Sequence, residues 1–513
     1  MRLNILIGGK AGQGINKVSA IIAQTLLSQG YFIFNYRDYP SIIRGGHNFN
    51  VLSISDKQIS SHESKIDIII ALDENTKQVH KNNINKNTII IDYKPFLNLG
   101  LNANIALAGA LAKVLGIEKQ ILLTQINSNL KGKPYLKSSL EAATAGYNSQ
   151  KQTNQLKKLN NKPTLLSGSK AISLGAINSN IDLYIAYPMT PATNALHELA
   201  KKQLEHNFMA FQAESEISVV NMALGSSFAG AKTMIGTSGG GFDLMTEGLS
   251  MQGISEIPLV VYLASRVGPG TGIPTYNMQG DLDIALRAGH GEFPRIVIAP
   301  GDPTETIEIT NQAFYLSEKH KALTIILSDK HIAESEFSST IKPQKPIKVK
   351  VNREVPGEKN TIIKATSYEH NQYGITTEDP TIAITNANKR LEKYKKIQQA
   401  CTQFPMIKTH GKKNSKNLII AWGSPKGAIV DAIKDLDYKF LQVIYMKPLS
   451  NQIKKEMQKA NKIILIESNL TGQLGRIIRE KTGISIKNRI LKYDGRPFRS
   501  DELKKQLERE LRK

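Results

Sequence analysis

The sequence predicts an α/β protein of several domains, with parallel or mixed sheets flanked by helices. Three observations carry this prediction. The chain has 513 residues, too many for one hydrophobic core, and about three domains of ordinary size would account for it. Strand-like apolar runs alternate with helix-like runs, a pattern typical of parallel sheets. The composition, with 40% hydrophobic residues, 38 glycines and 20 prolines, is that of a globular protein.

The first predicted domain covers residues 1–146. It begins with a strand over LNILIGG, continues through a glycine turn, and enters a helix over VSAIIAQTLLSQG. Further strand-like runs follow at 67–73 and 87–92. Residues 147–163 contain few hydrophobic side chains and are predicted to form a linker.

The second predicted domain, 164–340, alternates strands and helices from DLYIAYP to ALTIILSD. A connecting segment at 341–410 begins with text rich in lysine and proline and contains a charged helix at about 380–401. The last domain, 411–513, repeats the α/β pattern with NLIIAW, FLQVIYM and KIILIES as strands.

Cysteine usage limits the compartment and the chemistry. The single cysteine, Cys401, excludes an intramolecular disulfide and fits a reducing environment, so we expect a cytoplasmic protein. One thiolate cannot supply the roughly four that an iron–sulfur cluster takes. The sequence has no CxxC or HExxH pattern, and we predict no metal on this chain. No run approaches the roughly 18 apolar residues of a membrane span, so no membrane partner is expected.

The formal net charge of +23 raises the alternative of a nucleic-acid-binding module. The lysines and arginines are spread through helix-like segments, and aromatic residues, 6% of the chain, do not interleave a basic patch. We therefore expect a solvated basic surface, suited to an acidic protein partner, and no nucleic-acid partner.

Polar motifs follow three strands of the second domain. YPMTP comes after DLYIA, TSGGG after KTMIG, and SRVGPGTG after LVVYLA. In parallel α/β sheets, ligands bind beyond the carboxyl ends of the strands. The three motifs are therefore predicted to form one site.

Four side chains of this region are candidates for chemistry. Prolines on both sides of the YPMTP turn would hold the Thr190 hydroxyl in place. The Arg266 guanidinium could grip a carboxylate with two hydrogen bonds, or it could be a surface group in a glycine loop. Glu214 and Glu216 point about 200° apart on a helix, so only one can face a pocket. Both could equally be first-turn acids that favour the helix dipole.

Glycine runs offer weaker signals. Gly239 and Gly240, in TSGGG, would let the backbone approach another molecule closely, or would serve a tight turn. The N-terminal GGKAGQGIN departs from the G-x-G-x-x-G and P-loop spacings. It is better interpreted as a packing turn, although a nicotinamide-dependent oxidoreductase remains an alternative function.

Taken in order, these motifs resemble those of the alpha subunits of 2-oxoacid:ferredoxin (acceptor) oxidoreductases that carry a fused N-terminal gamma domain. The likeness covers essentially the whole chain. It rests on GGKAGQGI and YRDYPSIIRGGHN in the gamma-like part, and on YPMTPATN, QAESEIS, TSGGGFDLMTEGLS, RVGPGTGIPT, QGDL, AGHGEFPRIVIAPGDP, SYEHNQYGITTEDP, ESNLTGQLGR and LKYDGRPF beyond it. GSKA at 168–171 and Ser215 depart from the family pattern.

The resemblance implies a gamma domain, a pyrimidine-binding domain and a transketolase C-terminal-like domain. It further implies a thiamine diphosphate shared with a beta subunit, which would hold the Mg²⁺ and a [4Fe-4S] cluster. The reaction implied is coenzyme A-dependent oxidative decarboxylation of a 2-oxoacid, with 2-oxoglutarate favoured and pyruvate next, and with ferredoxin as electron acceptor. The assembly would be a heterodimer or a dimer of heterodimers. A transketolase-like subunit without ferredoxin is a further alternative.

Site roles carried over by the resemblance fall on the residues singled out above. Glu216 matches the carboxylate that binds the aminopyrimidine of the cofactor. Thr190 and Arg266 match positions that hold the 2-oxoacid, the arginine through the carboxylate. Gly239 and Gly240 match the cofactor-binding turn.

Overall fold

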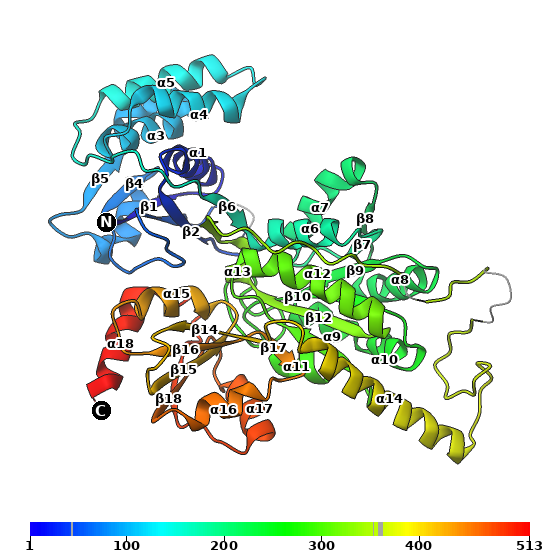
Figure 1. Ribbon diagram of the computed structural model, residues 1–513. Helices are drawn as coiled ribbons and strands as arrows, with labels where there is room; N and C mark the ends of the chain where they lie inside the picture. The colour runs from blue at the N-terminus through cyan, green and yellow to red at the C-terminus, as the bar shows by residue number, and fades with distance from the viewer. Residues whose placement is uncertain (43–44, 352, 358–362, 513) are drawn as a thin grey trace. The chain divides into compact units, whose positions relative to one another are not determined.

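The computed structural model describes residues 1–42, 45–351, 353–357 and 363–512. Within these ranges the chain forms two compact units, each built from separate stretches of sequence. The first unit consists of Met1–Leu166, Ser335–Ile341 and Arg499–Lys513, and the second of Ser167–Glu334 and Lys342–Phe498. The α/β class with mostly parallel sheets is confirmed, whereas the finer domain boundaries stay a prediction (Figure 1).

In the first unit, the described residues form a seven-stranded mixed sheet in the order β5-β4-β1-β3-β2-β13-β6. Strand β1 is parallel to β4 and antiparallel to β3, and β2 is antiparallel to both β3 and β13. The bounds are β1 (Arg2–Gly9), β2 (Phe32–Asp38), β3 (Asn48–Ser55), β4 (Ile68–Ala71), β5 (Ile89–Asp92), β6 (Thr164–Ser167) and β13 (Glu336–Ser339). The predicted strands at 3–9, 67–73 and 87–92 are confirmed as β1, β4 and β5.

The helices of the first unit are α1 (Ile15–Ser28), α2 (Glu74–Val79), α3 (Ala103–Val114), α4 (Lys119–Leu130), α5 (Leu136–Asn148) and α18 (Ser500–Arg512), with short 3-10 segments at Lys81–Asn83 and Lys94–Asn102. Of these, α1, α3, α4 and α5 bury apolar side chains in one core. The glycine turn joins β1 to α1, and Gly12 and Gly14 adopt the positive φ angles that its tight path requires.

One stretch differs from the expectation about membrane-length segments. Among the described residues, Lys94–Val114 has a mean hydropathy of 1.2. By length and composition alone, this stretch could cross a membrane. The stretch is not one regular helix, because Gly100 has non-helical angles (φ 53°, ψ −123°). Half of it is buried, and α3 lies in the core of the first unit. Burial in this core therefore accounts for the apolar composition of the stretch.

The segment predicted as a linker belongs to the first unit and has no helix or strand from 151 to 163. The Leu159 amide donates to the Gln29 carbonyl at 2.8 Å, and the Tyr31 hydroxyl donates to the Lys157 carbonyl at 2.8 Å. These bonds hold the segment against the residues between α1 and β2.

The second unit is centred on a seven-stranded sheet in the order β17-β11-β12-β10-β9-β7-β8. The strands from β11 to β8 are all parallel, and β17 adds an antiparallel edge. The bounds are β7 (Leu183–Ala186), β8 (Met209–Gln212), β9 (Thr233–Thr237), β10 (Leu259–Ser265), β11 (Arg295–Ile298), β12 (Leu323–Asp329) and β17 (Tyr445–Lys447). The central strands β10 and β12 are buried along their whole length, as parallel strands covered on both faces should be.

A smaller sheet completes the second unit in the order β14-β16-β15-β18-β19. Its bounds are β14 (Ile407–Gly411), β15 (Asn417–Trp422), β16 (Lys439–Val443), β18 (Lys462–Glu467) and β19 (Asn488–Leu491). The helices of this unit are α6 (Gly168–Asn178), α7 (Thr193–His206), α8 (Glu216–Phe228), α9 (Gly239–Leu244), α10 (Thr246–Ser255), α11 (Leu282–Arg287), α12 (Pro303–His320), α13 (Lys330–Glu334), α14 (Pro380–Cys401), α15 (Pro425–Ala432), α16 (Gln452–Gln458) and α17 (Gln473–Thr482). The predicted charged helix is confirmed as α14.

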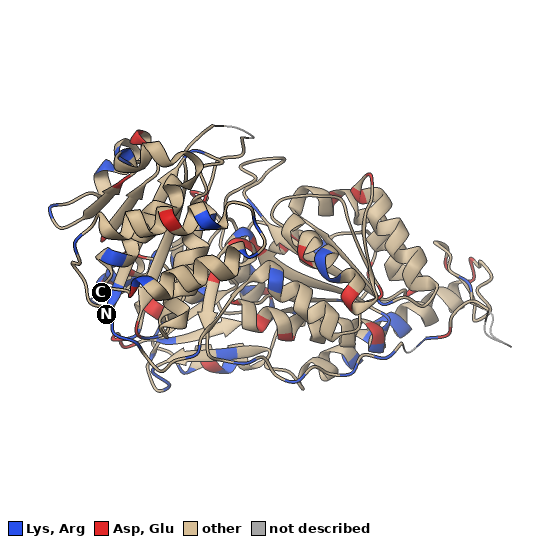
Figure 2. Cartoon of the chain, turned by 90° about the horizontal axis from the view of Figure 1, so that it is seen from above, with Lys and Arg blue, Asp and Glu red and all other residues tan. Residues whose placement is uncertain are grey.

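The positive charge is distributed over the fold. Figure 2 shows Lys and Arg interspersed with Asp and Glu along many elements. Several pair at the surface, such as Lys201 with Glu198 at 2.8 Å and Lys395 with Glu392 at 2.6 Å. This distribution is consistent with the solvated surface expected from the sequence.

Candidate active site

The predicted site motifs meet at one edge of the parallel sheet. Strands β10, β9, β7 and β8 are consecutive neighbours, and all four run in the same direction. YPMTP follows β7, TSGGG closes β9, Arg266 follows β10, and the glutamate pair follows β8. The carboxyl edge therefore collects every motif that the sequence assigned to it.

Helix α8 places Glu216 at this edge. Ser215 caps the helix, because its side chain accepts a hydrogen bond from the Ser218 amide at 3.2 Å. This serine, which departs from the family pattern, thus has a structural role. Glu216 is 4% exposed, and Val219 and Val220 of the same helix are buried in the core. The apolar residues after Glu216 hold its carboxylate in a fixed, desolvated place.

The two glutamates differ in burial and in their position relative to the helix. Glu214 is exposed, its carboxylate accepts a hydrogen bond from the Ser218 hydroxyl, and this bond lowers the pKa of Glu214. Glu216 lies buried at the first position of α8. The prediction of first-turn acids is therefore confirmed for Glu216 and wrong for Glu214, which precedes the N-cap; the choice of Glu216 as the site residue stays a prediction.

One oxygen of Glu216 has an unsatisfied hydrogen-bonding capacity. Its Oε1 atom is buried and accepts no hydrogen bond from the residues that the structure describes. A Cβ atom added to Gly241 would lie 2.7 Å from this oxygen and 2.2 Å from the Thr237 hydroxyl. Since buried carboxylate oxygens are normally paired, this oxygen is suited to a donor from a molecule bound beside the glycine turn.

The other two glycines of the turn have different surroundings. A Cβ on Gly239 would lie 2.6 Å and 2.7 Å from the carboxylate oxygens of Asp281, so no side chain fits there. Gly240 is exposed, and its nearest neighbour within the chain would be the Gly270 carbonyl at 3.8 Å. Gly240 therefore leaves open space at the edge where a ligand would lie. The cofactor-binding roles of both glycines stay predictions.

Arg266 and Thr190 are in direct contact. The Arg266 Nη1 atom donates to the backbone carbonyl of Thr190 at 2.9 Å. The contact runs through the Thr190 backbone, whereas the sequence drew attention to its hydroxyl. Partial burial lowers the pKa of the Arg266 guanidinium, and the charges of Asp281 and Glu216 act in the opposite direction. One bond to Thr190 leaves most donors of the fork free for an anion.

Asp281 is a residue of this site that the sequence did not single out. It precedes α11, and its Oδ2 atom is buried without a hydrogen-bond partner. Its motif, QGDL, offered a signal, but an aspartate before a helix is most often a cap. The Asp281 carboxylate lies beside Gly239 only in the folded sheet, so the sequence gives no sign of this contact.

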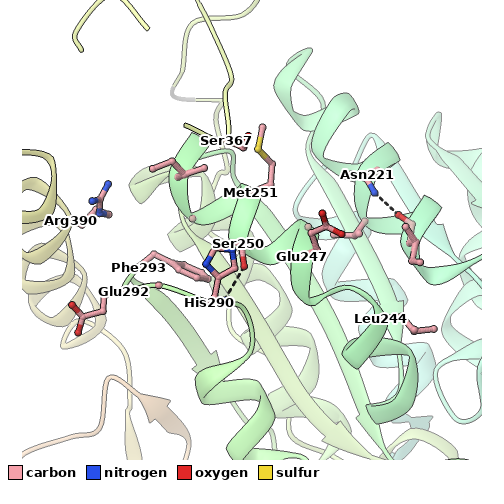
Figure 3. Close-up of a pocket in the computed structure, with 16 residues that line it drawn as sticks. Asn221, Leu244, Glu247, Ser250, Met251, His290, Glu292, Phe293, Ser367 and Arg390 are labelled. Atoms are coloured by element: carbon pink, nitrogen blue, oxygen red, sulfur yellow. Dashed lines mark hydrogen bonds between the residues drawn. The ribbon is translucent and has the colours of Figure 1, made fainter. Parts of the chain in front are cut away.

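A hollow of about 610 Å³ lies on the helical layer next to α8 (Figure 3). Its wall is formed by α8, α10, the loop at 290–293, Ser367 and Arg390 of α14. Figure 3 shows Asn221 and Leu244 on one side and Arg390 on the other. Ile217, which is 52% exposed, belongs to the same wall and follows Glu216 directly. The hollow thus adjoins the candidate site through the first turn of α8.

Comparison with known proteins gives a consistent result along the chain. Residues 174–405 match the family described as pyruvate flavodoxin/ferredoxin oxidoreductase, thiamine diphosphate-binding, and residues 4–99 match pyruvate ferredoxin/flavodoxin oxidoreductase. The alpha subunit of a 2-oxoacid:ferredoxin oxidoreductase from Sulfolobus sp. is 30% identical, over 99% of this chain and 96% of the relative. The 2-oxoglutarate synthase subunit KorA of Archaeoglobus fulgidus is 28% identical, over 62% of this chain and 90% of its own length.

Among solved structures, a 2-oxoglutarate:ferredoxin oxidoreductase from Magnetococcus marinus, with 2-oxoglutarate, coenzyme A and succinyl-CoA bound, is similar in fold. The TM-score is 0.91 at 25% identity, over 99% of both chains. The likeness therefore extends over both units of this chain.

Proposed function

The chain belongs to the alpha subunits of the 2-oxoacid:ferredoxin oxidoreductases, and from this premise we propose that it forms half of such an enzyme. With a beta subunit it catalyses coenzyme A-dependent oxidative decarboxylation of a 2-oxoacid and passes the electrons to ferredoxin. The favoured substrate is 2-oxoglutarate, with pyruvate next. Family similarity along the whole chain supports this function over the nicotinamide-dependent alternative.

The observation that carries the proposal is the unpaired Oε1 atom of Glu216. A buried carboxylate oxygen beside a glycine wall fits the edge of a planar, hydrogen-bonding ring such as an aminopyrimidine. Bound thiamine diphosphate would supply the nucleophilic carbon and the electron sink for decarboxylation. Glu216 would accept a hydrogen bond from a protonated ring nitrogen and hold the ring in one orientation, while Gly241 keeps the approach to its carboxylate open.

Arg266 binds the carboxylate of the 2-oxoacid in this proposal. The contact with the Thr190 carbonyl fixes one end of the guanidinium, so that the remaining N–H groups are directed without loss of rotamer freedom at binding. Partial burial strengthens the pairing with an anion, since water competes less for the donors. The side chain of Thr190, partly exposed on the same turn, adds the second contact.

A beta subunit is proposed to cover α8 and α9. Ile217 and Leu244 are 52% and 53% exposed on the two helices that flank the Glu216 carboxylate. Gly225 lies exposed in the interior of α8, where a Cβ would meet nothing within 4 Å. Glycine within a helix costs roughly 0.5–1 kcal/mol relative to alanine, and none of the described residues requires it at this position. A close-packed second chain accounts for both features.

The beta subunit would also bring what this chain cannot supply. The single cysteine is the buried Cys401, and a [4Fe-4S] cluster takes about four thiolates. The cluster and the Mg²⁺ that binds the diphosphate are therefore assigned to the beta subunit. The assembly is a heterodimer or a dimer of heterodimers.

The test is co-expression with a candidate beta subunit, followed by 2-oxoacid- and coenzyme A-dependent reduction of ferredoxin or methyl viologen. Each subunit alone is the control. Activity only in the mixture, dependent on thiamine diphosphate, supports the proposal, and the best 2-oxoacid identifies the substrate. Activity of this chain alone, or none in a well-formed complex supplied with cofactor, would contradict it.

A variant pair tests the role of Glu216. Glu216→Gln keeps the shape of the side chain and removes its charge, and we expect about a 100-fold or greater loss of turnover in a complex that still assembles. Glu214→Gln, two residues away and exposed, is the matched control and should retain activity. Equal activity of the two variants would remove Glu216 from its proposed role.

A further inference from the structure

A second carboxylate, that of Asp281, belongs to the same wall as Glu216. Asp281 lies at the N-terminal end of α11, but its side chain makes no capping hydrogen bond. The first amide of α11, that of Leu282, is instead satisfied by the Gln473 side chain at 3.1 Å. An aspartate at this position normally caps its own helix, so the orientation of Asp281 toward the site needs another explanation.

The backbone of the glycine turn is shaped to receive this carboxylate. A Cβ on Gly239 would lie 2.6 Å from Oδ2 and 2.7 Å from Oδ1 of Asp281. Oδ2 is buried and has no hydrogen-bond partner. The residue as a whole is only partly buried, so the carboxylate lies at the boundary between the protein interior and the open edge of the site.

Charges of both signs act on Asp281. Burial raises the pKa of the Asp281 carboxyl to about 6, the charge of Asp243 on α9 raises it as well, and the Ser265 side chain and the Arg266 guanidinium partly offset these effects. Glu216 also interacts with Arg266. The Arg266 guanidinium therefore interacts with the charges of two carboxylates, those of Asp281 and Glu216. A bound substrate anion would add one further negative charge.

We propose that Asp281 is a positioning residue that takes up a proton when the carboxylate of the 2-oxoacid binds beside Arg266, and that this uptake controls the pH dependence of 2-oxoacid affinity. The inference rests on the proposed function for the substrate class. In the protonated state, Asp281 no longer competes for the guanidinium, and its hydroxyl becomes a donor directed to the open side of the glycine turn. In the ionised state it repels the incoming anion.

The direction in which pH changes the affinity for the 2-oxoacid follows from the linkage between anion binding and protonation of Asp281. The bound anion disfavours the ionised form of Asp281 and so raises its pKa above the value of about 6 in the free enzyme. Affinity is then highest below pH 6 and falls as the pH rises toward the higher pKa of the bound state. If binding raises the pKa by about one unit, KM for the 2-oxoacid increases about fivefold between pH 6 and 8, out of about tenfold over the full titration.

The first experiment measures KM and kcat of the assembled complex between pH 6 and 8 for the wild type and two variants. Asp281→Asn cannot titrate, and we expect its KM to change less than twofold over this range and to remain near the low-pH value of the wild type. Asp283→Asn removes an acid from the same helix that pairs with Arg476 at the surface, and it should behave as wild type. A wild-type KM that is independent of pH, or a pH dependence that persists in Asp281→Asn, would overturn the proposal.

The second experiment measures proton uptake directly and does not require turnover. The complex is titrated with 2-hydroxyglutarate, which lacks the reacting carbonyl, in calorimetry buffers of different ionisation enthalpy at pH 7. We expect a fraction of a proton to be taken up by the wild type and none by Asp281→Asn. Absence of uptake in the wild type overturns the proposal even if the variant does not fold.

The two experiments also separate this inference from the proposed function. A complex that turns over 2-oxoacids without proton uptake at Asp281 would refute only the inference. A complex that neither turns over 2-oxoacids nor binds 2-hydroxyglutarate would refute both.

Discussion

A Cβ atom on Gly241 would lie 2.7 Å from the Oε1 atom of Glu216, closer than such atoms approach in proteins. The glycine is therefore required by the Glu216 carboxylate as well as by the Thr237 hydroxyl. This relationship ties the TSGGG run to the first residue of α8, although the two belong to different strand–helix connections. It also gives the first prediction.

Gly241→Ala should displace the Glu216 carboxylate and weaken the binding of thiamine diphosphate in the complex. The new methyl group would also lie 2.2 Å from the Thr237 hydroxyl, and both neighbours are buried. We expect at least a tenfold higher cofactor requirement for activity, measured by reconstitution of the cofactor-free complex. Gly240→Ala is the control, because its nearest contact within the chain is 3.8 Å away. Loss of activity in both variants would show that the whole turn contacts bound cofactor.

Arg266→Ala should act mainly on KM for the 2-oxoacid. A charge-assisted hydrogen bond contributes roughly 1.5–3 kcal/mol, so we expect KM to rise by about 10- to 100-fold with a smaller change in kcat. Arg266→Lys keeps the charge but cannot form two parallel hydrogen bonds, so its KM should lie between those of the wild type and Arg266→Ala. Steady-state kinetics with varied 2-oxoacid provides the measurement. An unchanged KM would place the substrate carboxylate elsewhere.

Substitutions at Gly225 should separate the stability of this chain from its assembly. Alanine there removes a helix-interior glycine from an exposed face, and we expect the isolated chain to gain about 0.5–1 kcal/mol. The same change should weaken binding of the beta subunit, and Gly225→Leu should weaken it further, because a Cβ at this position has no described residue within 4 Å and points to open space. Thermal unfolding of the chain and titration with the beta subunit measure the two effects. Unimpaired assembly of the leucine variant would move the interface away from α8.

Trp422, the only tryptophan of the chain, reports on a buried carboxyl group. Its Nε1 atom donates to Glu467 Oε1 at 3.2 Å, and burial raises the pKa of Glu467 from 4.5 to about 7. A negative charge beside Nε1 stabilises the excited indole, so the emission should shift to longer wavelength as the pH rises through about 7. Glu467→Gln should abolish the transition.

The same titration predicts a change in stability. The folded pKa of Glu467 is raised, so its contribution to stability is fully present below pH 4.5 and is lost as the pH rises through about 7. Thermal unfolding of the isolated chain between pH 5 and 8 should show this decline. A pH-independent emission with a normal unfolding transition would mean that Glu467 does not titrate in this range.

Local patterns predicted the elements and the edge at which the motifs meet. The strands before Arg266 and before TSGGG are buried apolar runs, so their ends could be identified from composition, and the parallel order then brings the motifs together. The pairing of Asp281 with Gly239 could not be predicted in this way. Each residue has an ordinary local explanation, a helix cap and a turn, and only the packed sheet reveals that the carboxylate and the glycine backbone touch. The partner of β13 was unpredictable for the same reason, since register and pairing are not encoded locally.

The first unit is assembled from three stretches of chain, and this has a consequence for its synthesis. Strand β2 emerges early, but its neighbour β13 is not made until residues 336–339 have been translated. At roughly 5–20 residues per second, the intervening second unit delays that pairing by on the order of 10–30 s. During this interval the apolar strand FIFNYRD has an open edge, which other strands can pair with. Nascent chains at this stage should therefore depend on chaperones more than the finished protein does.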